Sequence, residues 1–320
     1  MIVGSGLRNL SGAVLLYRSA DLEHWDFNAP VFLDEQNTGF SFLSGTIWEC
    51  PQIFQLKGIR LMQLSVRDTD QQLYTLAAQI DTSQGRFNFQ SVQKLDYGNE
   101  SFYAAQSFDY GGGRRILFGW IPEMRSETVQ RTAGWAGVLS LPRLLNLSAD
   151  GLLEICPAPE LVQLRGKNFH LHKPHPLNET PCTFIGVPSG SQLEIRAEIF
   201  SGQAQSFGMP IAVSDGADEK TLVYFDIERE ALVIDTTLSS QSIESGRYVG
   251  KIPHQLPADG VLRLHLLLDH SVLEIFNNDR VPFTTRIYPA NVHEQKVFWF
   301  ARGNRKILQI FDVWTMGSIW

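Results

Sequence analysis

Apolar residues in this chain occur in short runs of Val, Ile, Leu, Phe and Tyr, and each run is bounded by Gly, Asp, Asn or Ser. This pattern is typical of β-strands joined by tight turns. A sustained 3.6-residue apolar spacing, which would indicate amphipathic helices, is absent; only 159–164 predicts a brief helical turn. The sequence therefore predicts an all-β protein.

The length and the distribution of proline predict two domains. A chain of 320 residues is longer than one ordinary core accommodates. Six prolines between Cys156 and Pro188 would interrupt a regular ladder, so we place the boundary near Arg165, giving domains 1–165 and 166–320. In the second domain, leucines alternate with Arg and His over 262–268, which predicts a half-buried strand. Further predicted strands, including one at 184–187, are numerous enough for a β-sandwich.

Charge and hydropathy exclude two classes of partner. The chain has 27 Lys and Arg against 34 Asp and Glu, and its net charge of −7 offers no basic surface for nucleic acid. Its apolar runs are much shorter than the ~20 residues that a membrane span requires. We therefore predict neither a nucleic-acid partner nor a membrane partner.

Cysteine and histidine give no evidence of a disulfide framework or a metal site. The three cysteines lack zinc-ligand spacing. His170, His172 and His175 lie close together in the sequence, but no carboxylate or cysteine beside them completes a ligand set. We predict no metal and no cofactor.

Cellular location stays open. The first residues lack the basic and apolar regions of a secretory signal. Four Asn-x-Ser/Thr triplets would suit a secreted protein, although such triplets also arise by chance. These triplets begin at Asn9, Asn99, Asn146 and Asn178.

The run WECPQIF at 48–54 places one carboxylate, Glu49, among apolar neighbours. Such surroundings disfavour the ionised form of a carboxyl group, as is needed in a general acid that protonates a glycosidic oxygen. The alternative is a glutamate at a strand end, paired with an arginine or bonded to the backbone. The residues alone leave both interpretations open.

Several motifs resemble those of glycoside hydrolase family 32, the β-fructosidases that include invertases, levanases and inulinases. WECPQIF is similar to the Glu-Cys-Pro motif of that family, and LDYGNESFYAAQSFD at 95–109 is similar to its Asp-x-Gly segment. RRILFGW and GWAGVLSLPR follow in the family order. DHSVLEIFNNDRVPFTTRIYP at 269–289 resembles a strand pair of the family's β-sandwich.

The resemblance implies a five-bladed β-propeller followed by a β-sandwich, and retaining hydrolysis of terminal β-D-fructofuranosyl residues in sucrose, levan or inulin. Glu49 would be the general acid/base, which protonates the leaving oxygen and then activates water. Asp96, Tyr103 and Trp120 would bind the substrate, and Tyr103 would also form a hydrogen bond near Glu49. The alternatives are a turn residue for Asp96 and packing roles for Tyr103 and Trp120.

The sequence also departs from the family. The Asn-Asp-Pro-Asn-Gly motif with the aspartate nucleophile and the Arg-Asp-Pro motif are both absent, and we do not assign Arg67-Asp68-Thr69 to the second. We therefore expect a chain that begins after both motifs, with about three propeller blades at ~45 residues each and no nucleophile. Such a chain would be inactive alone unless a separate chain supplied the missing blades. The rival interpretation is a non-catalytic carbohydrate-binding or interaction protein that uses the β-sandwich.

Overall fold

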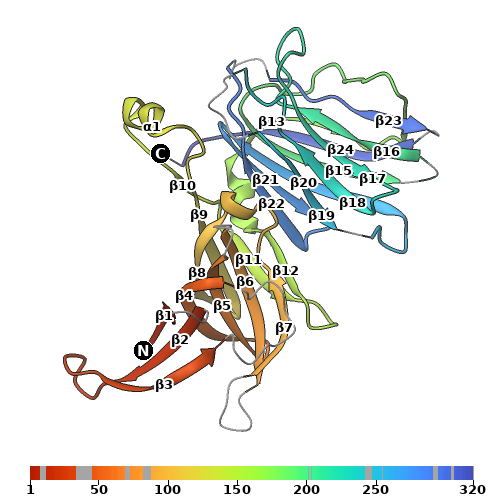
Figure 1. Ribbon diagram of the computed structural model, residues 1–320. Helices are drawn as coiled ribbons and strands as arrows, with labels where there is room; N and C mark the ends of the chain where they lie inside the picture. Colours follow the sequence, from red (N-terminus) through yellow and green to blue (C-terminus); the bar gives the residue numbers. More distant parts are fainter. Residues whose placement is uncertain are drawn as a thin grey trace. The chain divides into compact units, whose positions relative to one another are not determined.

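A computed structural model describes residues 1–7, 12–33, 45–68, 73–81, 88–200, 202, 204–241, 247–253, 255–290, 295–303 and 306–319 (Figure 1). Asn9 and Thr69 lie outside the described residues. The prediction of an all-β protein is confirmed, since strands dominate both compact units of the chain. The first unit comprises residues 1–122 and 137–158, and the second comprises 123–136 and 159–320. Among the described residues, no helix has the length and hydropathy of a membrane-spanning segment.

The first unit contains three antiparallel sheets in the part that the structure describes. The first has the order β1 (Ile2–Gly6), β2 (Gly12–Arg18) and β3 (Asp26–Leu33). The second follows chain order from β4 (Gly45–Leu56) through β5 (Ile59–Asp68) and β6 (Leu73–Asp81) to β7 (Asn88–Lys94). In the third, β9 (Arg114–Ile121) pairs with β8 (Tyr103–Gly111), β10 (Val138–Leu139) and β11 (Arg143–Leu147), and β11 pairs with β12 (Leu153–Pro157).

One core of the first unit lies around Trp48, whose side chain is fully buried. Apolar residues of β5 and β6 alternate toward it, because successive side chains of a strand point to opposite faces. Members of this cluster are Val14, Met62, Leu64, Val66, Leu76 and Ile80. Trp48 and Glu49 are consecutive in β4, so the strand buries one and presents the other on its opposite face.

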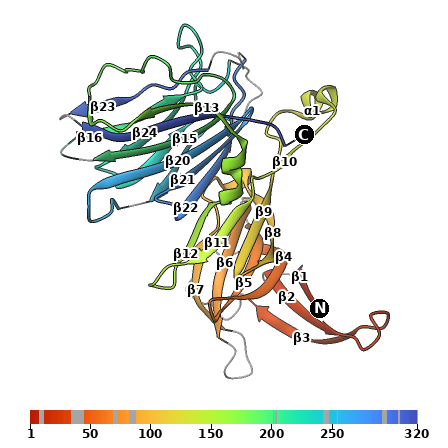
Figure 2. The ribbon, with the colours of Figure 1, turned by 180° about the vertical axis from the view of Figure 1, so that it is seen from behind.

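Glutamines hold the second sheet against the third, and these sheets lie side by side in both views (Figure 2). Each strand of the second sheet contributes one glutamine whose Nε2 donates to a main-chain carbonyl of the neighbouring sheet segment, at 2.5 to 3.0 Å. The donor and acceptor pairs are Gln52 with Ser107, Gln63 with Ala105, Gln79 with Gly151, and Gln93 with Leu153. These bonds satisfy backbone carbonyls outside the regular ladders.

Two glycines of β1 allow it to approach the backbone of β4. A Cβ atom on Gly4 would lie 2.2 Å from the Trp48 carbonyl oxygen, and one on Gly6 would lie 2.3 Å from that of Thr46. Because these residues are two apart in a strand, they face the same side. Glycine at both positions therefore sets how closely the first sheet approaches the strand that carries Glu49.

The second unit contains two antiparallel sheets in its described residues. One has the order β13 (Arg165–Leu171), β24 (Lys306–Met316), β15 (Gln192–Phe200), β20 (Val261–Asp269), β21 (Val272–Asn277) and β22 (Val281–Arg286), and β14 (His175–Leu177) also pairs with β24. The other has the order β19 (Val249–Pro253), β18 (Ala231–Asp235), β17 (Thr221–Asp226), β16 (Ala204–Ile211) and β23 (Phe300–Gly303). The two sheets pack closely, since a Cβ atom on Gly250 of β19 would lie 2.3 Å from the Phe283 ring of β22.

Two expectations for the second unit are wrong, and one is confirmed. Residues 184–187 form no strand. Strand β20 is buried on both faces rather than one, because His265 is enclosed and pairs with Glu194. The helical turn predicted at 159–164 is the 3-10 helix η4 (Pro159–Leu164).

The sequence analysis also missed the short helix α1 (Glu127–Ala133). Ser126 caps its N-terminus and Gly134, with φ of 78°, ends it. Seven residues are too few for a periodic apolar pattern to be seen.

Candidate active site

Glu49 lies at an interruption of strand β4. It pairs with Ser65, and the next paired residue, Gln52, is opposite Gln63, so Cys50 and Pro51 form a bulge. Cys50 has φ of 50°, a left-handed conformation that is uncommon for a residue with a side chain. Such bulges bend a strand and turn its side chains in a new direction. Glu49 is half-buried, and the apolar surroundings predicted for it are reduced, because Trp48 lies on the other face and Cys50 is exposed.

Tyr103 lies at a matching interruption in strand β8. It pairs with Trp120, and the register shifts before Gln106 meets Phe118. Ala104, between them, has φ of 49°. The Tyr103 hydroxyl donates a hydrogen bond to Glu49 Oε2 at 2.5 Å, which is the contact that the family resemblance implied. Burial of Tyr103, together with this bond, raises the pKa of its hydroxyl, so the phenol stays protonated and remains a donor.

Further hydrogen bonds join the two bulges. Gln106 Nε2 donates to the carbonyl oxygen of Cys50 at 3.2 Å. Gln52 Oε1 accepts from the Ser107 backbone N–H at 3.1 Å and from its hydroxyl at 2.7 Å. Glu49 and Tyr103 are thus placed by two strands that are bonded to each other immediately beyond the bulges.

Asp96 is buried beneath this region and has partners for both carboxylate oxygens. Oδ1 accepts from the backbone N–H of Gly98 at 2.7 Å, and Oδ2 pairs with Arg143 Nη1 at 2.8 Å. The side chains of Asp96 and Arg143 are 1% and 0% exposed. Arg143 also lies over the Phe102 ring, 4.1 Å from its centre. The geometry matches the turn interpretation, and a sugar contact by Asp96 stays a prediction.

Trp120 is the most exposed of the predicted site residues, at 44%. As the cross-strand partner of Tyr103, it lies on the same face of the third sheet. Its indole Nε1 would lie 2.4 Å from a Cβ atom on Gly137, so one edge of the ring is packed against that turn. The remaining surface is open, and stacking of a sugar on it stays a prediction.

Sequence reasoning missed two groups of polar residues. The inter-sheet glutamines were not singled out; the available signal was an amide in each otherwise apolar strand. The statement that no carboxylate completes the histidine cluster is corrected by the pairing of β13 with β24, which brings Asp312 against His170 and His172.

The arrangement around Glu49 is suited to proton transfer. Tyr103 is the hydrogen-bond partner of Glu49 within the described part of the chain and engages only Oε2. A half-buried carboxyl group held by a permanent donor can give a proton to a bound molecule and take one back. Retaining hydrolysis of a glycoside requires, in addition, a second carboxylate about 5 Å away.

Comparisons with known proteins find matches over nearly the whole chain. The model of the glycosyl hydrolases family 32 N-terminal domain matches residues 1–157, and that of the family 32 C terminal matches 160–315. A sucrose-6-phosphate hydrolase of Vibrio alginolyticus is 30% identical over 301 residues, covering 90% of this chain and 56% of the relative. A fructan 1-exohydrolase of Hordeum vulgare is 28% identical, covering 99% of this chain and 62% of the relative. The chain thus spans less than two thirds of these curated relatives.

Solved structures show the same fold. Fructan 1-exohydrolase IIa of Cichorium intybus matches with a TM-score of 0.83 at 21% identity, covering 99% of this chain and 69% of that one. Sucrose-6-phosphate hydrolase of Lactobacillus gasseri matches with a TM-score of 0.77 at 21% identity, covering all of this chain and 64% of that one. The likeness is to a β-propeller followed by a β-sandwich.

Proposed function

The chain belongs to glycosyl hydrolase family 32, and from that premise we propose that it is the part of a β-fructosidase-type hydrolase that carries the acid/base Glu49. The observation that supports this most directly is the hydrogen bond from Tyr103 to Glu49 between two strand bulges. A packing glutamate would not need two non-glycine residues in the left-handed conformation beside it.

We also propose that the three sheets of the first unit are three blades of a five-bladed propeller. The proposed domains are 1–165 for this part of the propeller and 166–320 for the β-sandwich. Supporting this, β1 approaches β4 through its glycines and β4 is bonded to β8, so that the first strands of successive sheets adjoin. First strands that line a common axis would present Glu49 toward that axis.

In the proposed mechanism Glu49 donates a proton to the oxygen that leaves the fructosyl group and later takes a proton from the attacking water. Tyr103 holds Oε2, which leaves Oε1 to face the sugar. Asp96 and Trp120 are proposed to contact the substrate. The nucleophile is proposed to lie outside these 320 residues, since neither aspartate motif of the family occurs in them. Sucrose, levan and inulin are the proposed substrates, and the names of the relatives add sucrose 6-phosphate.

The test combines this chain with the segment that it lacks. The purified chain is incubated with the four substrates, alone and after co-expression with the part of the Vibrio relative that precedes the matched region. We expect no fructose release from the chain alone and release from the pair. Glu49→Gln should lower that release by about 10²–10⁴-fold, since a general acid contributes that much.

Two variants make the test specific. Tyr103→Phe should lower the rate less than Glu49→Gln, because it removes the donor and keeps the carboxyl group. Glu154→Gln, at a half-exposed position of β12, should leave the rate unchanged. Fructose release by the chain alone would contradict the proposed inactivity, and equal rates for wild type and Glu49→Gln would exclude the acid/base role.

A second candidate function is carbohydrate binding by the β-sandwich. The second unit contains a cavity of about 260 Å³ with an apolar lining that includes Phe298, Phe300 and Leu222, and with Glu179 and Arg302 beside them. Aromatic rings with adjacent charged groups are suited to a sugar. If titration with fructo-oligosaccharides shows binding that Phe298→Ala abolishes and Glu49→Gln preserves, this function is favoured over hydrolysis.

A further inference from the structure

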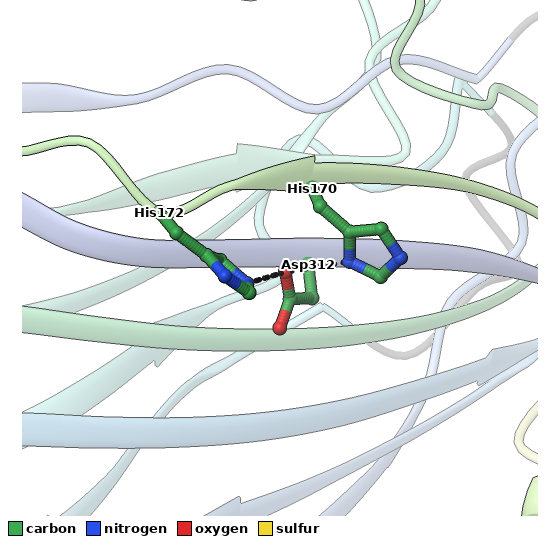
Figure 3. A group of neighbouring side chains, drawn as sticks. All are labelled: His170, His172 and Asp312. Carbon is green, nitrogen blue, oxygen red and sulfur yellow. Dashed lines mark hydrogen bonds and ion pairs between the residues drawn. The ribbon is translucent and has the colours of Figure 1, made fainter.

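We propose that His170, His172 and Asp312 form a binding site for a divalent transition-metal ion on the second unit. His170 Nδ1 and His172 Nε2 each lie 2.8 Å from Asp312 Oδ1. Figure 3 shows the two imidazole rings pointing toward the same carboxylate. This site is separate from the proposed acid/base and does not depend on the proposed function.

The ligand atoms have the separations that one ion requires. All three lie within 4.8 Å of one another. Metal–nitrogen and metal–oxygen bonds of ~2.1 Å place neighbouring ligand atoms about 3 Å apart, so the two N···O distances already fit. The rings are inclined at 62° with centroids 5.8 Å apart, so they do not stack and both nitrogens can face one point.

The topology explains why these residues meet. Strand β13 lies at the edge of its sheet and pairs with β24, where His170 is directly opposite Asp312. His172 follows two residues later, just beyond the end of β13, and its side chain returns to the same carboxylate. The His170 ring also packs edge-on against Trp314 at 5.4 Å, which limits its freedom to turn away.

Two arginines lie near Asp312, and both form an ion pair with another carboxylate, Glu194. Arg196 is its cross-strand neighbour on β15, and Arg165 lies close by on β13. Both guanidinium groups are engaged by Glu194, Arg165 at 2.6 Å and Arg196 at 3.4 Å. Within the described residues, the hydrogen-bond partners of the Asp312 carboxylate are the two imidazoles.

Two imidazoles and one carboxylate favour Zn²⁺, Ni²⁺, Co²⁺ or Cu²⁺ over Mg²⁺ and Ca²⁺, which prefer oxygen ligands. The histidine side chains are 43% and 63% exposed, so an ion can enter and water can complete its coordination. Binding requires Nδ1 of His170 and Nε2 of His172 to be unprotonated. A neutral imidazole carries its single proton on one of its two ring nitrogens. Binding therefore uses the tautomer in which the other nitrogen of each ring carries that proton.

A bound ion would fasten the edge of the sandwich. It would link β13 and the connection to β14 to the long strand β24, in addition to the backbone ladder. Because the folded chain binds the ion and the unfolded chain lacks the site, metal would raise the unfolding temperature of the second unit.

Titration calorimetry with Zn²⁺ on the untagged, chelator-treated full chain tests the proposal, and Co²⁺ absorption reports the ligand set. We expect one Zn²⁺ per chain and a higher unfolding temperature with Zn²⁺. His172→Ala and Asp312→Asn should each weaken binding by at least about tenfold, as loss of a ligand weakens a site at least as much as loss of its supporting contacts. Because His172 is exposed, the His172→Ala variant should fold like the wild type, and circular dichroism checks its fold.

The matched control is His270→Ala. His270 is an exposed histidine whose Nδ1 lies 2.8 Å from Asp269 Oδ1, and among the described residues no second imidazole joins this pair. The control should bind Zn²⁺ like the wild type. Absence of Zn²⁺ binding by the wild type, or equal binding by wild type and His172→Ala, would overturn the proposal.

Discussion

The two units place their unusual backbone conformations differently. In the first unit, Cys50 and Ala104 have positive φ within strands, each directly after a predicted site residue. In the second unit, positive φ at Glu230, His270 and Asn278 occurs in turns between paired strands, and positive φ at Ala212 occurs just after the end of β16. Turns use such conformations to reverse the chain, whereas a strand that contains one is bent at that point.

The units also use buried charge differently. In the second unit, Glu123 and Glu194 are enclosed by arginine, histidine and tyrosine partners that fasten segments of the sandwich together. In the first unit, Asp96 and Arg143 form a buried ion pair, and the half-buried carboxyl group of Glu49 accepts a hydrogen bond from a phenol. The buried charges of the second unit stabilise its packing, whereas the bent strands of the first unit carry the residues for which a catalytic role is proposed.

The largest expected effect is on the first unit. Asp96→Asn removes the carboxylate that lies 2.8 Å from buried Arg143, and we expect a loss of about 3 kcal/mol in the free energy of unfolding. Hydrogen exchange measured by mass spectrometry resolves the two units, and faster exchange should be confined to the first. Asp109→Asn is the control, because exposed Asp109 makes the same 2.7 Å bond to the backbone two residues on, without a buried arginine. Equal losses from both variants would show that the ion pair is not the source.

A smaller effect is expected from Glu123→Gln in the second unit. The Glu123 side chain is 1% exposed, accepts bonds from Arg125 Nε and Nη2 at 3.0 Å, and also accepts from the Tyr288 hydroxyl. Losing the charged acceptor should cost about 2 kcal/mol, seen in the denaturant midpoint of the second unit. Glu127→Gln on the exposed face of α1 should change that midpoint little, because its pair with Arg131 is in solvent. If Glu123→Gln lowered the stability of the first unit instead, the role assigned to this buried charge in the second unit would be wrong.

Acid should weaken the second unit in two stages. Burial lowers the pKa of His265 below its ordinary 6.5, so as pH falls through 6.5 the unfolded chain binds a proton that the folded chain does not. Stability is therefore lost below pH 6.5, by at most about 1.4 kcal/mol per pH unit.

The second stage belongs to the two buried glutamates. Burial acts to raise their pKa values from 4.5, but bonds from Arg125 to Glu123 and from Arg165 and His265 to Glu194 lower both to about 2. Their contribution is complete above pH 4.5 and is lost as pH falls toward 2. Unfolding midpoints measured against pH test both stages. His265→Gln should flatten the first stage, and a first stage unchanged by it would assign that stage to other groups.

The smallest effect concerns the bulge at Ala104. Glycine adopts positive φ without the cost that an L-residue bears, so Ala104→Gly should stabilise the first unit by up to about 1 kcal/mol. Ala105→Gly, at a buried position with ordinary φ, should destabilise it by a similar amount. Thermal unfolding compares the two, and a loss of stability in both would mean that the left-handed residue bears little strain.

The strands best predicted from sequence are those that consist of one short run rich in apolar residues. The short apolar runs at 61–66, 73–80 and 116–121 predict strands by their composition, and these segments lie within β5, β6 and β9. Strand β4 was recognised only as a motif, because Pro51 and Glu49 break its alternation and the strand continues through a bulge.

Contacts between distant segments were harder to foresee. Family resemblance indicated Tyr103 near Glu49, whereas nothing local to the sequence places Asp312 beside His170 or Arg143 beside Asp96. Such pairs depend on which strands are neighbours, and many strand orders are compatible with one alternation pattern.

The glutamines that join the second and third sheets have an evolutionary consequence. Their acceptors are main-chain carbonyls of Ser107, Ala105, Gly151 and Leu153, which every amino acid provides. Mutation can therefore change the side chains on the accepting sheet without removing the acceptors, provided that the path of its backbone is kept. Only the glutamine donors must keep their chemical type. These bonds therefore restrict substitution at four positions of the second sheet and leave the accepting positions of the third sheet free to change their side chains.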